Sequence, residues 1–364
     1  MRNDVEQSPA GGAKRLVKIL AIDGGGARGI IPAMVLEEIE RRTGKPIHEL
    51  FDLIAGTSTG SLIAAMLTVP RPGGASIRSA AEIVRFYDGE GAELFFARSE
   101  EYAERAAEGR IPAFPASSHI AGIRAAISSE ARLSEAASNV VVTFYNLSET
   151  PPRTYDMTRW KARHGRDGDD PADHDFLLWE GIRGASIFPG IFPGATLHAV
   201  SGKAYFPLDG GMFSINPVLQ GLAHGIRLIG NKGLDGDDYA FAIVSLGTGY
   251  FNHTDLVGEV TQPWGPEQWY RRGAAPHLVE VLFEGQTDAA AGLMRDIHWS
   301  DGRVPHYFRF QPAMSHDFKL YDVDPRSLAT LRGYAETMLR ERDADIEAIC
   351  SLLACGKGLP SSGG

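Results

Sequence analysis

Residues 18–29 read KILAIDGGGARG, and residues 51–60 read FDLIAGTSTG. Each stretch begins with a short apolar run, Lys18–Ile22 and Phe51–Ala55, of the length that is typical of a buried strand. A glycine-rich loop ends each run, and apolar residues at helical spacing follow both loops. This order of strand, glycine loop and helix, which occurs twice, predicts a parallel α/β sheet.

The rest of the chain continues the alternation of strands and helices. The expected strands are Asn139–Leu147, Tyr239–Leu246 and His306–Gln311, and the expected helices are Ile30–Arg42, Ser61–Thr68, Ala81–Phe96, Phe176–Ala185, Pro276–Ile297 and Pro325–Leu353. We therefore predict a three-layer α/β fold in which helices flank a mostly parallel central sheet.

Charge and composition exclude several classes of partner. The formal net charge is −10 at pH 7, so a nucleic-acid polymer is not expected, because no basic domain would neutralise its phosphates. The two cysteines, Cys350 and Cys355, would point in different directions on a helix, which disfavours a disulfide and a zinc cluster. No signal peptide is evident, and no apolar run approaches the ~18 residues of a transmembrane helix. We expect a cytoplasmic protein that contacts the inner membrane only peripherally.

The first glycine loop has three interpretations. Gly24, Gly26 and Gly29 satisfy G-x-G-x-x-G, the fingerprint of an NAD(P)-dependent oxidoreductase, but the second strand then ends without the acidic residue that binds ribose. A tight structural turn is the second interpretation. The third is an oxyanion hole, because consecutive glycine N–H groups beside a helix N-terminus favour negative charge. The candidate residues of that hole are Gly24, Gly25, Gly26, Arg28 and Gly29.

The second loop matches the G-x-S-x-G pattern of a nucleophile elbow. Its residues are Gly56, Thr57, Ser58, Thr59 and Gly60. The flanking glycines relieve crowding at a sharp strand-to-helix turn, so the serine hydroxyl can stand exposed. Ser58 is therefore a candidate nucleophile, and the simpler alternative is a serine that only caps the following helix.

A serine nucleophile needs a base. Asp209 is followed by Gly210 and Gly211 at the end of an apolar segment, an arrangement that presents a carboxylate with the backbone folded closely around it, although Asp-Gly-Gly also makes ordinary turns. The late histidines are the other candidates, and each is more typical of a surface or structural position. Those histidines are His253, which directly follows an apolar strand, and His277, His298, His306 and His316.

These three elements resemble, in order and spacing, the patatin-like phospholipase family. The elements are Asp23–Gly29, Gly56–Gly60 and Asp209–Gly211. The likeness covers about residues 18–250 and is weaker beyond Asn252. It also includes Gly184-Ala185-Ser186, Asn216-Pro217 and Ser245–Gly249.

The resemblance implies a patatin-like fold and a phospholipase A-like lipid acyl hydrolase with a Ser58–Asp209 dyad and no histidine. Asp209 would take the proton of Ser58, the amides of Gly25 and Gly26 would hold the oxyanion, and water would hydrolyse the acyl-enzyme. Arg28 would orient the loop or contact a lipid phosphate. No metal or cofactor is implied, and the substrate would be a phospholipid or another acyl lipid. A lipid- or nucleotide-binding protein without catalysis is the remaining alternative.

Within the family, the chain length, the start of the likeness at residue 18 and the stretch Glu284–Asp288 resemble bacterial stand-alone enzymes. Some of these are antiphage effectors that a cyclic nucleotide activates. The resemblance therefore implies an antiviral defence effector that degrades membranes, with the nucleotide response in the C-terminal half.

The extent of the resemblance, together with the Gly, Ser and Pro content of the two ends, divides the chain into four parts. These are a flexible N-terminus at 1–15, a catalytic core at 16–250, a C-terminal helical and β extension packed on the same domain at 251–355, and a flexible tail at 356–364.

Three groups of bulky side chains are candidates for lipid contact. They are Phe95 with Phe96, the loop Ile187–Pro193, and the aromatic residues Trp264, Trp269 and Tyr270. Each could form part of an acyl pocket or dip into a bilayer. Ordinary core packing is the alternative for all three.

Overall fold

The computed structural model describes residues 14–74, 77–166, 168–251, 258–271, 277–300, 302–315 and 318–359. Its main sheet has the strand order β10-β8-β1-β2-β3-β4, and β7 also pairs with β3. The first five strands in this order are parallel, and β4 and β7 run antiparallel to β3. The strands are β1 (Arg15–Ile22), β2 (Leu53–Gly56), β3 (Asn139–Asn146), β4 (Arg153–Thr158), β7 (Pro207–Asp209), β8 (Tyr239–Leu246) and β10 (His306–Phe310).

Helices cover both faces of this sheet. Alternate residues of β1 belong to two different apolar cores, with Ile19 and Ala21 in one and Leu20 and Ile22 in the other. A parallel sheet is buried in this way because its crossover helices lie on its faces. The predicted three-layer α/β fold with a mostly parallel sheet is therefore confirmed.

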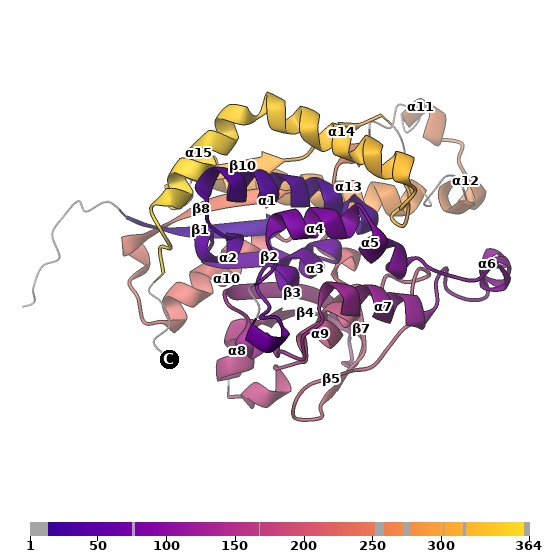
Figure 1. Cartoon of the computed structure of the whole chain (residues 1–364), viewed down its shortest axis with the longest axis horizontal. Helices are drawn as coiled ribbons and strands as arrows, with labels where there is room; N and C mark the ends of the chain where they lie inside the picture. Colours follow the sequence, from indigo (N-terminus) through magenta and orange to yellow (C-terminus); the bar gives the residue numbers. More distant parts are fainter. Residues whose placement is uncertain are drawn as a thin grey trace, which may run out of the picture.

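The larger core is covered by helices from both ends of the chain. Figure 1 shows α1, α3 and α4 in front of the central strands, while α10 and α13 lie behind them. The front layer contains α1 (Ile30–Thr43), α3 (Thr59–Met66), α4 (Ala80–Tyr87), α5 (Glu90–Phe95), α7 (Ala116–Ala126), α9 (Leu178–Ala185), α14 (Pro325–Glu341) and α15 (Asp343–Ala354), and the back layer contains α10 (Val218–Asn231) and α13 (His277–Ser300).

Smaller elements complete the described chain. They are the helices α2 (Ile47–Leu50), α6 (Glu100–Ala107), α8 (Arg159–His164), α11 (Gly258–Thr261) and α12 (Pro266–Arg271), and the short strands β5 (Leu197–His198), β6 (Ala204–Tyr205), β9 (Tyr250–Phe251) and β11 (Ala313–Met314). None of the described helices is long and apolar enough to cross a bilayer.

Two long helices predicted from the sequence are each broken in the structure. The helix expected over Ala81–Phe96 is α4 and α5, separated where Gly89 takes an extended conformation. The helix expected over Pro325–Leu353 is α14 and α15, separated at Arg342. Arg342 donates to the carbonyl oxygen of Arg309 at 3.1 Å, and its guanidinium lies over the ring of Phe310 at 5.0 Å. Because this contact with β10 is non-local, no helix-ending signal marks it in the sequence.

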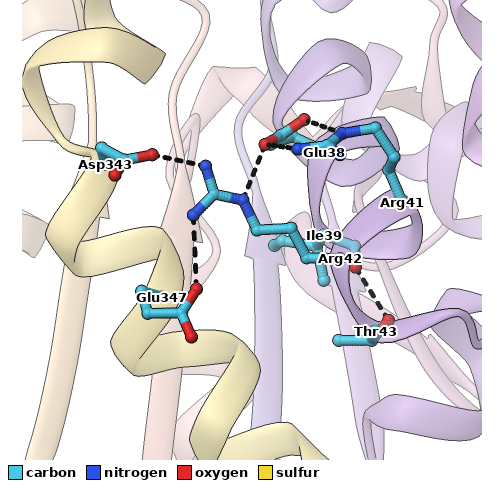
Figure 2. A network of polar contacts seen from close by, with 7 residues as sticks. All are labelled: Glu38, Ile39, Arg41, Arg42, Thr43, Asp343 and Glu347. Carbon is cyan, nitrogen blue, oxygen red and sulfur yellow. Dashed lines mark hydrogen bonds and ion pairs between the residues drawn. The ribbon is translucent and has the colours of Figure 1, made fainter.

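The C-terminal helices are tied to α1 by a network of charges. Arg42 lies between Glu38 on its own helix and Asp343 and Glu347 on α15, as Figure 2 shows. Arg41 also contacts Glu38 at 2.7 Å. Hydrogen bonds from Arg41 and then Arg42 hold the pKa of Glu38 at about 2, well below its usual range. The charge network therefore fastens the start of α15 to the end of α1.

The end of the described chain is held against the start of the sheet. The backbone N–H groups of Gly358 and Leu359 donate to the carboxylate of Asp52 at 3.0 and 2.9 Å, and Leu359 is buried. The flexible tail was predicted to begin at residue 356, but contacts with the core extend to Leu359. Residues 360–364 and residues 1–13 of the predicted flexible ends lie outside the described residues. Both cysteines are free.

Candidate active site

Ser58 stands on a sharp turn between β2 and α3. Its φ of 53° makes it the only non-glycine residue with a positive φ in the part of the chain that the structure describes. A Cβ at Gly56 would lie 2.3 Å from the carbonyl oxygen of Gly60, and a Cβ at Gly60 would lie 2.1 Å from that of Ile22. Both positions therefore require glycine, and the close backbone packing holds Ser58 in its strained conformation.

The two threonines of the elbow anchor it on both sides. The Thr57 hydroxyl donates to the carbonyl oxygen of Ser214 at 2.7 Å and lies 3.1 Å from the hydroxyl of Thr143. The Thr59 hydroxyl is hydrogen-bonded to the hydroxyl of Tyr87. These contacts fix the elbow and leave Ser58 as its chemically available side chain.

Asp209 meets Ser58 at the end of the antiparallel strand β7. The Ser58 hydroxyl donates to Oδ2 of Asp209 at 2.6 Å, and the N–H of Gly211 donates to Oδ1 at 2.7 Å. A Cβ at Gly210 would lie 2.1 Å from the hydroxyl oxygen of Thr143, so the chain passes β3 too closely for any other residue. The Asp-Gly-Gly turn therefore holds one oxygen of the carboxylate, and Ser58 contacts the other.

Burial shifts the acidity of this carboxyl group. Asp209 is 1% exposed, and burial raises its pKa to about 6, although the hydrogen bonds from Ser58 and Gly211 oppose the shift. The group is thus ionised at neutral pH and close enough to neutrality to accept and return a proton.

The first glycine loop leaves two backbone donors available. The N–H of Gly24 donates to the carbonyl oxygen of Ile215, that of Ala27 to Leu320, and that of Arg28 to Gly25. Among the described residues, no acceptor meets the N–H of Gly25 or of Gly26, and both glycines line the cavity that contains Ser58. Of the five predicted oxyanion-hole residues, only these two offer free donors there.

The remaining residues of the loop support its shape. A Cβ at Gly25 would lie 2.3 Å from the Thr248 hydroxyl oxygen, and that hydroxyl donates to the carbonyl oxygen of Gly24 at 2.7 Å. Gly26 has a φ of 58°, and a Cβ there would lie 2.0 Å from the carbonyl oxygen of Leu320. A Cβ at Gly29 would lie 2.6 Å from the ring of Tyr87. Close packing thus requires glycine at each of these positions.

Arg28 does not line the cavity that contains Ser58. It is 8% exposed, its Nε donates to the carbonyl oxygen of Gly25 at 3.4 Å, and its guanidinium lies 5.1 Å from the ring centre of Phe251. It lines a second cavity, together with charged residues of α13 such as Glu280 and Arg295.

An ion pair that sequence reasoning missed supports the start of the loop. The guanidinium of Arg309 on β10 contacts both carboxylate oxygens of Asp23, and one of its nitrogens also donates to the Ser245 hydroxyl at 2.8 Å. A lone arginine in the apolar strand expected over His306–Gln311 was the available signal. Its partner could not be identified without the sheet order.

Ser58 opens into an apolar cavity. The walls include Phe95 and Phe96 of the predicted lipid-contact groups and three residues of the predicted Phe-Pro loop, Phe188, Ile191 and Phe192. The only charged side chain among the described lining residues is Asp209. The site therefore joins a buried Ser–Asp pair and two free backbone donors to an apolar chamber.

The sequence that forms this site matches the model of a known protein family. Residues 20–222 match the family model described as patatin-like phospholipase, which is more than half of the chain and contains both Ser58 and Asp209. The chain belongs to the patatin-like phospholipase family. It is accordingly a lipid acyl hydrolase, within the carboxylic ester hydrolases.

Similar proteins with curated descriptions carry patatin names. Patatin-like protein 1 of Oryza sativa subsp. indica is 28% identical over 94% of this chain and 86% of its own. Patatin-like protein 2 of Arabidopsis thaliana is 27% identical over 78% and 72%, and patatin group J-1 of Solanum tuberosum is 26% identical over 79% and 72%. Among solved structures, VipD from Legionella pneumophila is weakly similar, with a TM-score of 0.37, 11% identity and coverage of 92% of this chain and 72% of that one.

The late histidines of this patatin-like enzyme do not reach Ser58 where the structure describes them. His298 contacts the carbonyl oxygen of Val304 at 2.7 Å, and neither it nor His306 lines the cavity. His253 and His316 lie outside the described residues, as does the side chain of His277. His119 on α7 does line the cavity, and no motif in the sequence marked it.

The dinucleotide interpretation of the first loop finds no support in the geometry of this patatin-like enzyme. The second strand, β2, ends at Gly56 and leads directly into Ser58, so the place of the ribose-binding acid is occupied by the elbow. No group of three histidine, cysteine or acidic side chains in the described ranges could hold a metal ion.

Proposed function

We propose that Ser58 is the nucleophile and Asp209 the general base of this hydrolase, which acts through an acyl-enzyme. The observation that supports this most directly is the 2.6 Å hydrogen bond from the Ser58 hydroxyl to a buried carboxylate with a raised pKa. A serine hydroxyl is a weak nucleophile until such a base accepts its proton.

The proposed reaction has two steps. Asp209 accepts the proton of Ser58 while Oγ attacks the ester carbonyl, and the N–H groups of Gly25 and Gly26 receive the oxyanion. The alcohol then leaves with the proton that Asp209 returns. In the second step Asp209 accepts a proton from water while the water oxygen attacks the acyl carbon, and Asp209 then returns that proton to Oγ of Ser58 as the fatty acid leaves. Each oxyanion donor is worth about 3 to 4 kcal/mol in such reactions.

The other loop residues would act by support. The Nε of Arg28 binds the carbonyl of Gly25, and that carbonyl shares one peptide unit with the N–H of Gly26. We propose that Arg28 orients this peptide, while Gly24 and Gly29 permit the close packing of the loop. The second predicted role of Arg28, contact with a lipid phosphate, would have to occur from the second cavity.

The apolar cavity supports a phospholipid or another acyl lipid as substrate, with its acyl chain inside. We further propose peripheral contact with a bilayer on the cytoplasmic side of the inner membrane. Seven of the thirteen exposed large apolar side chains in the described chain belong to residues 250–299, which we call the α11–α13 surface. They are Tyr250, Val260, Tyr270, Val281, Leu282, Leu293 and Trp299.

The position and charge of this surface favour a bilayer of neutral lipids. Phe283 on α13 lines the catalytic cavity next to the exposed Leu282, and Figure 1 shows α11 and α12 at the same end of the molecule as α5, which also lines that cavity. The described part of α13 is acidic, so docking would rest on apolar insertion and not on attraction to anionic lipid.

Residues 251–355 are proposed to form part of the same domain as the core at 16–250. Strand β10 pairs with β8 in the main sheet, and the buried side chains of α14 and α15 belong to the larger core.

Activation by a cyclic nucleotide and a role in antiviral defence stay predictions from the resemblance alone. The relatives reported above have patatin names, and these names mention no response to a nucleotide. Acyl release measured with and without cyclic mononucleotides and dinucleotides tests this prediction.

Acyl release from phospholipid vesicles tests the dyad. We expect Ser58→Ala and Asp209→Asn to lose activity, while Ser351→Ala, at an exposed position on α15, keeps it. Hydrolysis by Ser58→Ala would refute the proposal. If the wild-type protein bound lipid without hydrolysing it, the alternative of a binding protein would hold.

A further inference from the structure

One polar side chain in the apolar cavity has no role in the proposed reaction. His119 on α7 is 1% exposed and lines the cavity, whose only charged described lining residue is Asp209. Its ring stacks on Phe192 with centroids 4.0 Å apart and planes 10° apart, and it packs against Phe95 at 6.1 Å. These contacts fix the orientation of the imidazole.

The hydrogen bonds around His119 define its tautomer. The Ser186 hydroxyl donates its single hydrogen to the carbonyl oxygen of Ile182 at 2.8 Å, with Arg183 as a longer alternative acceptor. The Nε2 of His119 lies 3.0 Å from the same hydroxyl oxygen, and we assign Nε2 as the donor in that contact because the hydroxyl hydrogen is directed to Ile182. Nδ1 is then unprotonated and can only accept a hydrogen bond.

The environment keeps the imidazole neutral. Burial, and secondarily the charge of Arg183, lower the pKa of His119 to about 3. Within the described residues, Nδ1 has no hydrogen-bond partner. Nδ1 is therefore available to accept a hydrogen bond from a ligand in the cavity.

We propose that Nδ1 of His119 accepts a hydrogen bond from a hydroxyl group carried on the acyl chain, which makes esters of hydroxylated fatty acids the preferred substrates. This inference rests on the proposed function, since it needs the acyl chain to lie in the cavity beside Ser58.

The chemistry of the cavity selects a hydroxyl over other donors. An ammonium group would be buried there without a neighbouring anion once Asp209 is engaged with Ser58. The other buried hydroxyls of the wall are already paired, Thr59 with Tyr87 and Ser186 with Ile182. A hydroxyl group on an otherwise apolar acyl chain is therefore the donor that fits Nδ1 of His119 and the apolar wall around it.

A comparison of paired substrates tests the inference. The probes are esters of one alcohol with an unmodified long acyl chain and with the same chain carrying a single hydroxyl at successive carbons. The wild-type enzyme should hydrolyse one positional isomer with a kcat/KM about 3- to 10-fold above that of the unmodified ester, the effect of one hydrogen bond. Equal values for every isomer would overturn the inference.

Variants separate this role from a structural one. His119→Phe keeps the stacking but removes the acceptor. The ratio of kcat/KM for the preferred hydroxylated ester to that for the unmodified ester should therefore fall to one, while the unmodified ester is still hydrolysed. His119→Asn places an oxygen near the position of Nδ1 and should retain part of the preference. Ile123→Val, in the same wall, should leave the ratio unchanged.

The opposite results are equally informative. A preference that survives in His119→Phe would assign hydroxyl recognition to another group and overturn the inference. Failure of the proposed function would appear separately, as hydrolysis of the unmodified ester by Ser58→Ala. If His119→Phe does not fold, the positional series on the wild-type enzyme together with His119→Asn still decides the matter.

Discussion

The Ser58 hydroxyl lies 2.6 Å from a carboxylate oxygen of Asp209, inside a cavity wall where that carboxyl group is 1% exposed. The pair joins two parts of the chain that are 151 residues apart. It is possible because β7 brings the Asp-Gly-Gly turn beside the carboxyl end of β3, next to the elbow at the end of β2.

The raised pKa of Asp209 predicts an acid limb in the activity profile. A base must be deprotonated to accept the proton of Ser58, so kcat/KM should be constant above about pH 7 and fall below a pKa near 6. Well below that pKa the decline should approach tenfold per pH unit. The profile is measured with a soluble ester whose alcohol does not titrate, and a limb near pH 4 would contradict the predicted burial effect.

Removing the buried charge should stabilise the protein. The folded pKa of Asp209 is above its unfolded value of 3.8, so the unfolded state binds fewer protons between about pH 4 and 6, and the stability falls as the pH rises through that window. At pH 8 Asp209→Asn removes this penalty, which is at most about 3 kcal/mol. Thermal unfolding at pH 8 should show a higher Tm with activity lost. At pH 4 the gain should shrink, and an equal gain at both pH values would contradict a charge effect.

The glycine loop predicts a substitution that can be rescued. Gly25→Ala places a Cβ within 2.3 Å of the Thr248 hydroxyl oxygen, so the loop must shift and the labelling of Ser58 by a fluorophosphonate should slow at least tenfold. Thr248→Gly in the same protein clears the space and should restore part of the rate. Gly285→Ala on α13, which meets nothing within 4 Å, is the matched control with unchanged labelling. If Gly25→Ala were labelled as fast as the wild-type protein, the loop would not be as tightly packed as the structure shows.

The α11–α13 surface predicts a variant that separates membrane docking from chemistry. Leu282→Glu and Leu293→Glu, at side chains that are each 53% exposed, should weaken sedimentation with phosphatidylcholine vesicles and slow hydrolysis of vesicle lipid. Hydrolysis of a soluble short-chain ester should not change. Ile226→Glu on α10, at a similar exposure of 47%, is the control that should bind normally. Equal losses in all three variants would argue against this surface.

Local backbone constraints made much of the site predictable. Glycine at 56 is required by a contact within the elbow itself, while glycines at 60 and 210 are required by close approach to Ile22 on β1 and Thr143 on β3. All three stand at fixed spacing beside Ser58 or Asp209, so the elbow and the Asp-Gly-Gly motif are visible in the sequence. The parallel sheet was predictable for the same reason, because strand, loop and helix alternate within short windows.

The non-local parts were not predictable from the sequence. The Gly24 N–H donates to the carbonyl oxygen of Ile215, Thr248 supports the loop from the turn after β8, and Arg309 pairs with Asp23 across the sheet. His119 enters the cavity only because α7 packs beside α5. Each of these depends on tertiary packing, which leaves no periodic or spacing signal.

The identity of the nucleophile is the central claim, and covalent labelling tests it most directly. Intact-mass analysis after reaction with a fluorophosphonate, followed by peptide mapping, should find one adduct on Ser58 in the wild-type protein. Ser58→Ala should take no adduct, and Asp209→Asn should react far more slowly than wild type. An adduct on another residue, or ester hydrolysis that persists in Ser58→Ala, would contradict the proposed Ser58–Asp209 dyad.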